Sequence, residues 1–187
     1  MGLGLMEFKI KILKSPTKED WQWVKTCTLN TVGKLATKEA TDEWKIKLLK
    51  SEHSPIRELW FGIKMEIPYY VSVHLVRHHI GVNHYVQTQR DDRTTDNIPR
   101  AEKPQGEKVS HIMSINAQEL IFLAHKRLCN QADITTRQVV KEVCRQVIAT
   151  NPEFKQFLVP MCEYLHTCNE FYPCGRIKNI ENEQEKC

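Results

Sequence analysis

The chain has 187 residues, of which 41% are hydrophobic, and a formal net charge of +4 at pH 7. This length and composition suit a single domain with a full core, and there is no apolar run long enough to predict a membrane span. The basic residues are spread along the chain, which argues against a nucleic-acid partner and favours small anionic ligands. The opening residues 1–6 are too short for the apolar part of a secretory leader, so we expect a cytoplasmic protein.

One strand and two helices are predicted in the first 51 residues. Residues 6–14 alternate apolar and lysine side chains, which is the period of a half-buried strand. Thr17 stands before apolar residues at helical spacing and is the predicted N-cap of the first helix. A second amphipathic helix is predicted over residues 38–50 and should end near Ser51.

The clearest strand comes after the turn at Ser54-Pro55. Its apolar side chains alternate and share one face: Leu59, Phe61, Ile63, Met65 and Ile67. Pro68 ends this strand and fits the first turn of a helix that we expect to continue to His79. Residues 91–109 are charged, hold two prolines and a glycine, and show no period, so they predict a long loop that could act as a lid.

The rest of the chain is predicted to be mainly helical. One apolar stripe follows Asn116 and ends at Arg127, and a second follows the candidate N-caps Asp133 and Thr135. Arg137 lies in the first turn of that second helix, where the helix dipole disfavours a cation. An acidic ligand near Arg137 would explain its position, and so would an ordinary surface pairing.

Residues 77–93 form the most distinctive segment, because they crowd cationic, titratable and amide side chains together. Arg77, His78 and His79 open it, and further polar groups follow up to Arg93. Guanidinium groups match phosphate oxygens in bidentate geometry, and histidine donates to phosphate or moves protons near neutral pH. The segment therefore predicts a site for a phosphorylated ligand, with a solvated helix end as the structural alternative.

The seven cysteines suggest a second site. An odd count in a chain without an export signal favours thiols or metal ligands over disulfides. Cys162, Cys168 and Cys174 are separated by five residues each, and Cys129 could join them if the tail folds back. These four predict a zinc or iron–sulfur site, although the spacing is looser than in paired Cys-x-x-Cys motifs. Reduced cysteines packed against the helices are the alternative.

The order of these features resembles that of the flavin-dependent thymidylate synthases over about residues 6–150. The signature of that family is Arg-His-Arg, seven residues, then Ser. Arg77 and His78 match it, whereas His79 replaces the second Arg and Gln87 replaces the Ser.

Two later motifs of the family survive in part. Its Ala-Gln-Trp-Glu-Ile-Arg pattern is kept here as Ala132 and Arg137, and its Asn-x-Arg is kept as Asn116, with Gln118 in place of the Arg. The resemblance implies an α+β fold, with a mixed sheet flanked by helices, that assembles as a homotetramer. We expect residues 1–160 to form this domain and residues 161–187 to form a cysteine-rich tail.

The resemblance also implies a reaction: methylation of deoxyuridine monophosphate to thymidylate with FAD, NADPH and methylenetetrahydrofolate. By position, the residues implied in cofactor binding are Ser54, Arg77, His78, His79 and Asn116. Those implied in nucleotide binding are Gln87, Gln89, Arg90, Arg127 and Arg137. Among these, Arg127 matches the catalytic arginine that polarises the uracil ring.

The departures from the family pattern leave three alternatives open. The chain could be a related enzyme that modifies C5 of deoxyuridylate, or a nucleotide-binding homologue without turnover. The third alternative is a nucleic-acid-binding module held together by a metal at the cysteine-rich tail, although the mild net charge counts against it.

Overall fold

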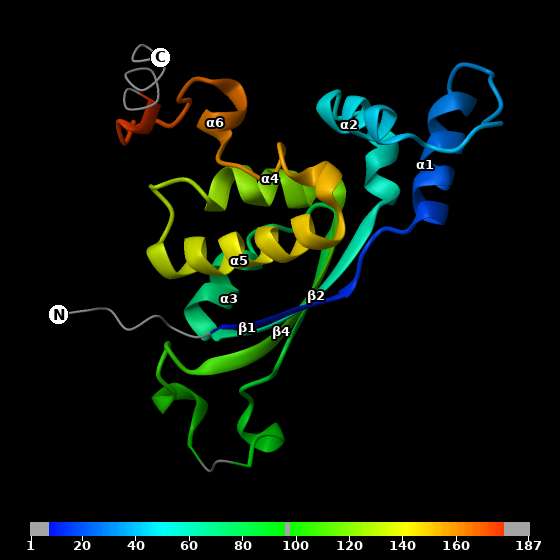
Figure 1. Cartoon of the computed structure of the whole chain (residues 1–187). Helices are drawn as coiled ribbons and strands as arrows, with labels where there is room; N and C mark the ends of the chain where they lie inside the picture. Colours follow the sequence, from blue (N-terminus) through cyan, green and yellow to red (C-terminus); the bar gives the residue numbers. More distant parts are fainter. Residues whose placement is uncertain (1–7, 96–97, 178–187) are drawn as a thin grey trace.

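The computed structural model describes residues 8–95 and 98–177, and it contains a four-stranded sheet whose inner face is covered by helices (Figure 1). In chain order, the helices and strands are β1 (Lys9–Lys14), α1 (Lys18–Asn30), α2 (Asp42–Lys50), β2 (Trp60–Pro68), α3 (Tyr69–Leu75), β3 (Val82–Val86), β4 (Lys108–Asn116), α4 (Ala117–Arg127), α5 (Ile134–Thr150) and α6 (Met161–Leu165). Four short 3-10 helices lie between them: Ser54–Glu58, Asp91–Arg93, Arg100–Glu102 and Pro152–Phe154. The α+β class is confirmed.

The sheet is antiparallel throughout, so the expectation of a mixed sheet is wrong for the described residues. The strand order is β1-β2-β4-β3, and all three neighbouring pairs are antiparallel. Two of these strands, β3 and β4, were not expected from the sequence. In β4 the polar His111 takes a buried position, so the alternation of apolar and polar residues that predicts a strand is interrupted. Strand β3 has only five residues, and two of them, Asn83 and His84, are polar.

The core lies between the inner face of β2–β4 and the helices α3, α4 and α5 (Figure 1). The paired inner residues of the two long strands are Phe61 with Ile115, Ile63 with Met113, Met65 with His111, and Ile67 with Val109. All eight side chains are buried, so the period-two pattern predicted for the first of these strands is confirmed.

The N-terminal helices begin at side-chain caps. The Thr17 hydroxyl accepts from the Asp20 amide at 3.3 Å, and the Asp20 carboxylate accepts from the Thr17 amide at 2.9 Å. This reciprocal pair confirms the predicted cap of α1. Helix α2 begins later than predicted, at Asp42, because the Thr41 hydroxyl caps it by accepting from the Trp44 amide. The first two residues of the predicted strand over 6–14 lie outside the described residues.

Helix α3 is shorter than predicted, and this shortening shapes the site. It ends at Leu75, with Pro68 as its N-cap, so the cationic residues Arg77 to His79 lie in the connection to β3. That connection turns at Gly81, which has a φ of +74°. The predicted long loop ends at β4, and its last part is tied to α3 because the Glu107 carbonyl accepts from the Tyr69 amide at 2.8 Å.

The two long C-terminal helices were predicted correctly. The Asn116 side chain caps α4, and Asp133, the first of the two candidates, caps α5. The short helix α6 packs on α4, where Tyr164 stacks on His125. Residues 178–187 of the predicted tail lie outside the described residues. None of the described helices is both long and apolar enough to cross a membrane.

Candidate functional site

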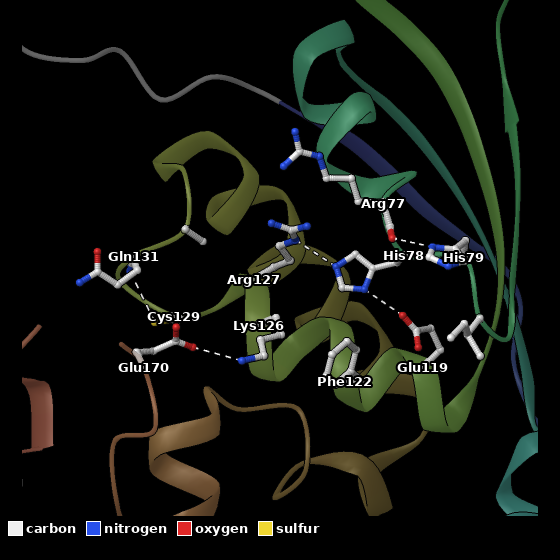
Figure 2. A pocket seen from close by; sticks show the side chains of 12 residues that line it. Arg77, His78, His79, Glu119, Phe122, Lys126, Arg127, Cys129, Gln131 and Glu170 are labelled. Carbon is white, nitrogen blue, oxygen red and sulfur yellow. Dashed lines mark hydrogen bonds and ion pairs between the residues drawn. The ribbon is translucent and has the colours of Figure 1, made fainter. Parts of the chain in front are cut away.

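The connection between α3 and β3 faces one side of α4 across a pocket of about 460 Å³ (Figure 2). Its walls include three residues that were predicted as ligands within the segment 77–93, namely Arg77, His78 and His79. Arg127 of α4 lines the same pocket. The structure therefore brings together side chains that are about fifty positions apart in the sequence. These four residues form the arrangement that we call the cationic pocket.

His78 is at the centre of this pocket and is itself buried. Its Nδ1 lies 2.8 Å from the Glu119 carboxylate, and its Nε2 accepts from the Nε–H of Arg127 at 3.0 Å (Figure 2). Because a carboxylate accepts and a guanidinium donates, a neutral imidazole with its proton on Nδ1 satisfies both contacts. His78 therefore orients Arg127, and both of its ring nitrogens are engaged.

The guanidinium groups of Arg77 and Arg127 lack carboxylate partners among the described residues. Arg127 donates only to His78 and, at 3.0 Å from its Nη2, to the carbonyl oxygen of His74. No hydrogen bond or ion pair engages the guanidinium of Arg77 in the described structure. Burial first, and then the neighbouring charge of Arg77, lower the pKa of Arg127. The carboxylates of Glu119 and Glu170, which also line this pocket, pair with His78 and Lys126 instead. Two neighbouring cations that no carboxylate pairs with provide a site for an anion.

Backbone contacts at Gly81 hold the two sides of the pocket together. The Asn116 amide donates to the Gly81 carbonyl at 2.9 Å, and the Asn116 side chain accepts from the Glu119 amide at 3.0 Å. A Cβ at position 81 would lie 2.4 Å from the Asn116 side-chain nitrogen, so only glycine fits there. The cap of α4 thus rests against the turn that carries His78, and it sets the position of Glu119.

A second pocket of about 590 Å³ adjoins the first and shares Ile80, Glu119 and Phe122 with it. Asn116, Arg57, Tyr164 and the buried His125 are also among its lining residues. Burial lowers the pKa of His125, and a hydrogen bond to the backbone of Phe157 opposes that effect. The Nε2 of His125 has no hydrogen-bond partner among the residues that the structure describes. We call this space the aromatic pocket. It is lined by both aromatic and polar side chains.

Several predicted ligands lie elsewhere. Ser54 is exposed at the start of its 3-10 helix and is not among the residues lining either pocket. Gln87 and Gln89 line a separate, smaller pocket, where the Gln87 side chain accepts from the Ser110 amide at 3.1 Å. Arg90 is paired with Asp92 through two contacts of 2.9 Å. The structure therefore does not bring these four residues together with the cationic pocket.

Arg137 also lies outside the cationic pocket. Its guanidinium donates to the Asn130 side chain at 3.1 Å, and it borders a different surface pocket near Lys141 and Arg145. The Asn130 contact engages Arg137 with a neighbouring side chain, and its part in nucleotide binding stays a prediction.

The four cysteines predicted as metal ligands do come together. Cys129, Cys162, Cys168 and Cys174 all line one small pocket between α4 and the segment after α6. Within residues 8–95 and 98–177, however, no three His, Cys, Asp or Glu side chains are grouped so that they could hold a metal ion. Burial raises the pKa of the Cys162 thiol, which favours the protonated form. The zinc or iron–sulfur site stays a prediction.

Sequence reasoning missed Glu119, Phe122 and Lys126, which all line the cationic pocket. A signal for Glu119 was present, because an acidic residue three positions after the N-cap Asn116 falls in the first turn of α4. Phe122 gave no such signal, because it falls within the apolar stripe of α4. Its ring contacts that of His78 edge-on, with centroids 5.9 Å apart.

Comparison with known proteins gives a likeness of fold. A crystal structure of a UMP/dUMP methylase, PolB from Streptomyces cacaoi, bound with 5-Br dUMP, superimposes with a TM-score of 0.59. The superposition covers 82% of this chain and 97% of that chain, at 15% sequence identity. No family model matches the chain, and no curated protein matches it in sequence. At this identity the likeness shows that the two chains share a fold.

Proposed function

We propose that the chain is an enzyme that methylates or otherwise modifies C5 of deoxyuridine monophosphate. The observation that carries this proposal is the pair of guanidinium groups of Arg77 and Arg127, which lack a carboxylate partner among the described residues. A nucleotide brings the phosphate charge and the polar uracil edge that such a pair can bind. The fold shared with a protein described as a UMP/dUMP methylase supports the same ligand class.

We further propose that the methylation uses FAD, with NADPH as reductant and methylenetetrahydrofolate as the carbon donor. The aromatic pocket fits a flat ring system, because Phe122 and Tyr164 line it and Asn116 and Arg57 supply polar groups. When bound there, the flavin would supply the hydride chemistry that the protein side chains lack.

The contribution of the chain itself is orientation and electrostatics. Arg127 would donate to the uracil edge or the phosphate, and its direction is set by His78 and by the carbonyl of His74. Glu119 keeps the proton of His78 on Nδ1, so that Nε2 remains an acceptor for Arg127. The shared wall at Phe122 would keep the nucleotide and the cofactor in adjacent spaces.

A homologue that binds nucleotide without turnover is the second candidate. The side chain of Gln87, which replaces the signature serine of the resembled family, is engaged with the backbone of β4. It is therefore already bonded within the protein and lies apart from the cationic pocket. This candidate predicts affinity for deoxyuridine monophosphate without flavin-dependent oxidation of NADPH.

We also propose that the protein assembles as a homotetramer. The outer face of the sheet leaves Leu13 of β1 about half exposed and Tyr85 of β3 more than half exposed. A second copy could cover such side chains. Sedimentation equilibrium of the purified chain measures the assembly directly, and a monomer at all concentrations would contradict the tetramer.

The test of the proposed function is spectroscopic. We would record the visible absorbance of the purified protein with and without added FAD, and then titrate deoxyuridine monophosphate while following the flavin band. A perturbed band supports a shared site, and NADPH oxidation and product analysis then identify the reaction. Nucleotide binding measured by calorimetry without any bound flavin would favour the second candidate. Absence of both kinds of binding would show that the proposal is wrong.

A further inference from the structure

A buried chain of hydrogen bonds runs behind the cationic pocket. The Ser72 hydroxyl of α3 lies 3.0 Å from Nδ1 of His111, and Nε2 of His111 lies 2.9 Å from Nδ1 of His84. Nε2 of His84 then lies 2.7 Å from the backbone carbonyl oxygen of His78. Ser72, His84 and His111 are not among the residues that line the cationic pocket, and the hydrogen bond to the backbone of His78 links this chain to the site.

With both rings neutral, the chemistry of the groups fixes the direction of every bond in this chain. A carbonyl oxygen only accepts, so His84 must carry a proton on Nε2. In the neutral ring, Nδ1 of His84 then accepts from the Nε2–H of His111, and Nδ1 of His111 accepts from the Ser72 hydroxyl. The chain is fully satisfied with both rings neutral.

Burying the polar ring of His111 in the core would destabilise the fold if the ring lacked hydrogen-bond partners. It is fully buried on the inner face of β4, between Val109 and Met113, where its neighbours are apolar. Burial first, and then His84, lower its pKa to about 4, so the ring stays neutral near neutral pH. Near neutral pH the neutral ring of His111 keeps its hydrogen bonds to Ser72 and His84, and these bonds hold the His84 side chain in place.

The sequence places His84 six residues after His78, with the left-handed turn at Gly81 between them. This turn folds β3 back, so that the His84 side chain meets the carbonyl of His78. The imidazole of the same His78 orients Arg127. One residue thus transmits the position of β3 to the guanidinium that faces the ligand.

We propose that His84 is a positioning residue that holds His78, and through it Arg127, in the orientation that binds the nucleotide, with His111 and Ser72 holding His84. The nucleotide part of this inference rests on the proposed function. The orientation of His78 and Arg127 is a property of the protein without ligand, and it can be tested separately.

The first test uses the wild-type protein alone. Nitrogen-15 NMR of the histidine rings assigns each tautomer, and we expect His78 to carry its proton on Nδ1 and both His84 and His111 to carry theirs on Nε2. The Nε–H of Arg127 should give a signal protected from solvent exchange. The opposite tautomer at His84 would overturn the proposal, and it would do so whether or not any variant folds.

The second test compares variants of His84. His84→Leu removes the donor to the His78 carbonyl, whereas His84→Gln keeps a donor at about the same reach. We expect His84→Leu to lose the protected Arg127 signal and to bind deoxyuridine monophosphate about fivefold to tenfold more weakly, the equivalent of one lost hydrogen bond. We expect His84→Gln to stay within about twofold of wild type on the same scale.

The control is Tyr85→Phe, which changes an exposed neighbour on the same strand and should alter neither signal nor affinity. Unchanged His78 and Arg127 signals in folded His84→Leu would overturn the positioning role. If the wild-type protein binds no deoxyuridine monophosphate, the proposed function fails, yet the ring tautomers and the Arg127 signal still decide the inference.

Discussion

At the scale of single residues, the site depends on a guanidinium held by neutral partners. Arg127 is directed by an imidazole nitrogen and a carbonyl oxygen, and neither of these neutralises its charge. A carboxylate partner would orient an arginine equally well, but it would also cancel the attraction for an anion. Two acidic residues line the same pocket, but Glu119 bonds to His78 and Glu170 pairs with Lys126, so neither contacts the Arg127 guanidinium in the described structure.

The variant Arg127→Lys separates charge from geometry. Lysine keeps the positive charge, but its single ammonium group cannot bond to His78 and to the His74 carbonyl and also form a bidentate pair with a ligand. We expect affinity for deoxyuridine monophosphate, measured by calorimetry, to fall about tenfold to a hundredfold, with the fold retained. Arg145→Lys is the control, because Arg145 is exposed and paired with Glu142. Equal affinity in wild type and Arg127→Lys would remove Arg127 from the site.

Arg77 allows a different test, because its guanidinium has no partner to lose in the described structure. Arg77→Gln should leave the free energy of unfolding unchanged or raise it by up to about 0.5 kcal/mol, since it removes repulsion from Arg127. The same variant should bind deoxyuridine monophosphate about tenfold more weakly and with a smaller dependence on salt. Chemical denaturation and calorimetry measure the two effects. A clear loss of stability would show that Arg77 has a structural partner.

At the scale of elements, the site depends on the contact between the Gly81 turn and the cap of α4. Gly81→Ala would introduce strain at a positive φ and would also place a Cβ 2.4 Å from the Asn116 side chain. Gly33 provides a matched control, because its φ is +68° and a Cβ there meets nothing within 4 Å. We expect Gly33→Ala to cost about 1 kcal/mol of unfolding free energy and Gly81→Ala to cost about 3 kcal/mol.

Chemical denaturation of the two glycine variants measures this difference. Gly81→Ala should also weaken nucleotide binding, because displacing Asn116 moves Glu119 and with it His78. Gly33→Ala should bind like wild type, since Gly33 lies after α1 and does not line either pocket. Equal costs for the two substitutions would mean that Asn116 moves aside freely.

The elements that the sequence predicted well are those whose signals are local. Caps such as Thr17 and Asp133 act within three residues, and the alternation along β2 needs no partner strand to be recognised. Strand β4 was missed because its buried His111 depends on hydrogen bonds with residues of α3 and β3. These partners become known only once the fold is known. The antiparallel order was missed for the same reason, since it depends on those two strands.

The site was predicted to a similar degree. Arg77 and His78 were predicted as ligands from the chemistry of their segment, Arg127 was assigned from a family resemblance, and the structure brings the three together. Gln87 and Arg90 follow the same motif in sequence, but both lie after the end of β3 and are already bonded within the protein. The role of Glu119 depends on the distance between two elements, which the order of residues does not give.

At the scale of the whole molecule, the buried histidines make the stability depend on pH. The pKa of His111 falls from its ordinary value of 6.5 to about 4 on folding, because burial first and then His84 disfavour the charged ring. The unfolded chain therefore binds a proton at this residue before the folded chain does. The stability that the neutral His111 contributes to the folded state is fully present above pH 6.5 and is lost as the pH falls towards 4. The lowered pKa of His125 acts in the same direction.

Denaturation of the wild-type protein at a series of pH values measures this effect. We expect His111 to lower the free energy of unfolding by about 3 kcal/mol between pH 6.5 and pH 4, because each unit of pKa shift corresponds to about 1.4 kcal/mol. His111→Gln should flatten the curve over that window and cost stability at pH 7, because the chain to His84 loses its ring. His79→Gln is the control: His79 is exposed, so its replacement should leave the slope unchanged. If wild type and His111→Gln lose stability in parallel as the pH falls, then His111 must accept a proton in the folded state and the neutral chain behind the site is wrong.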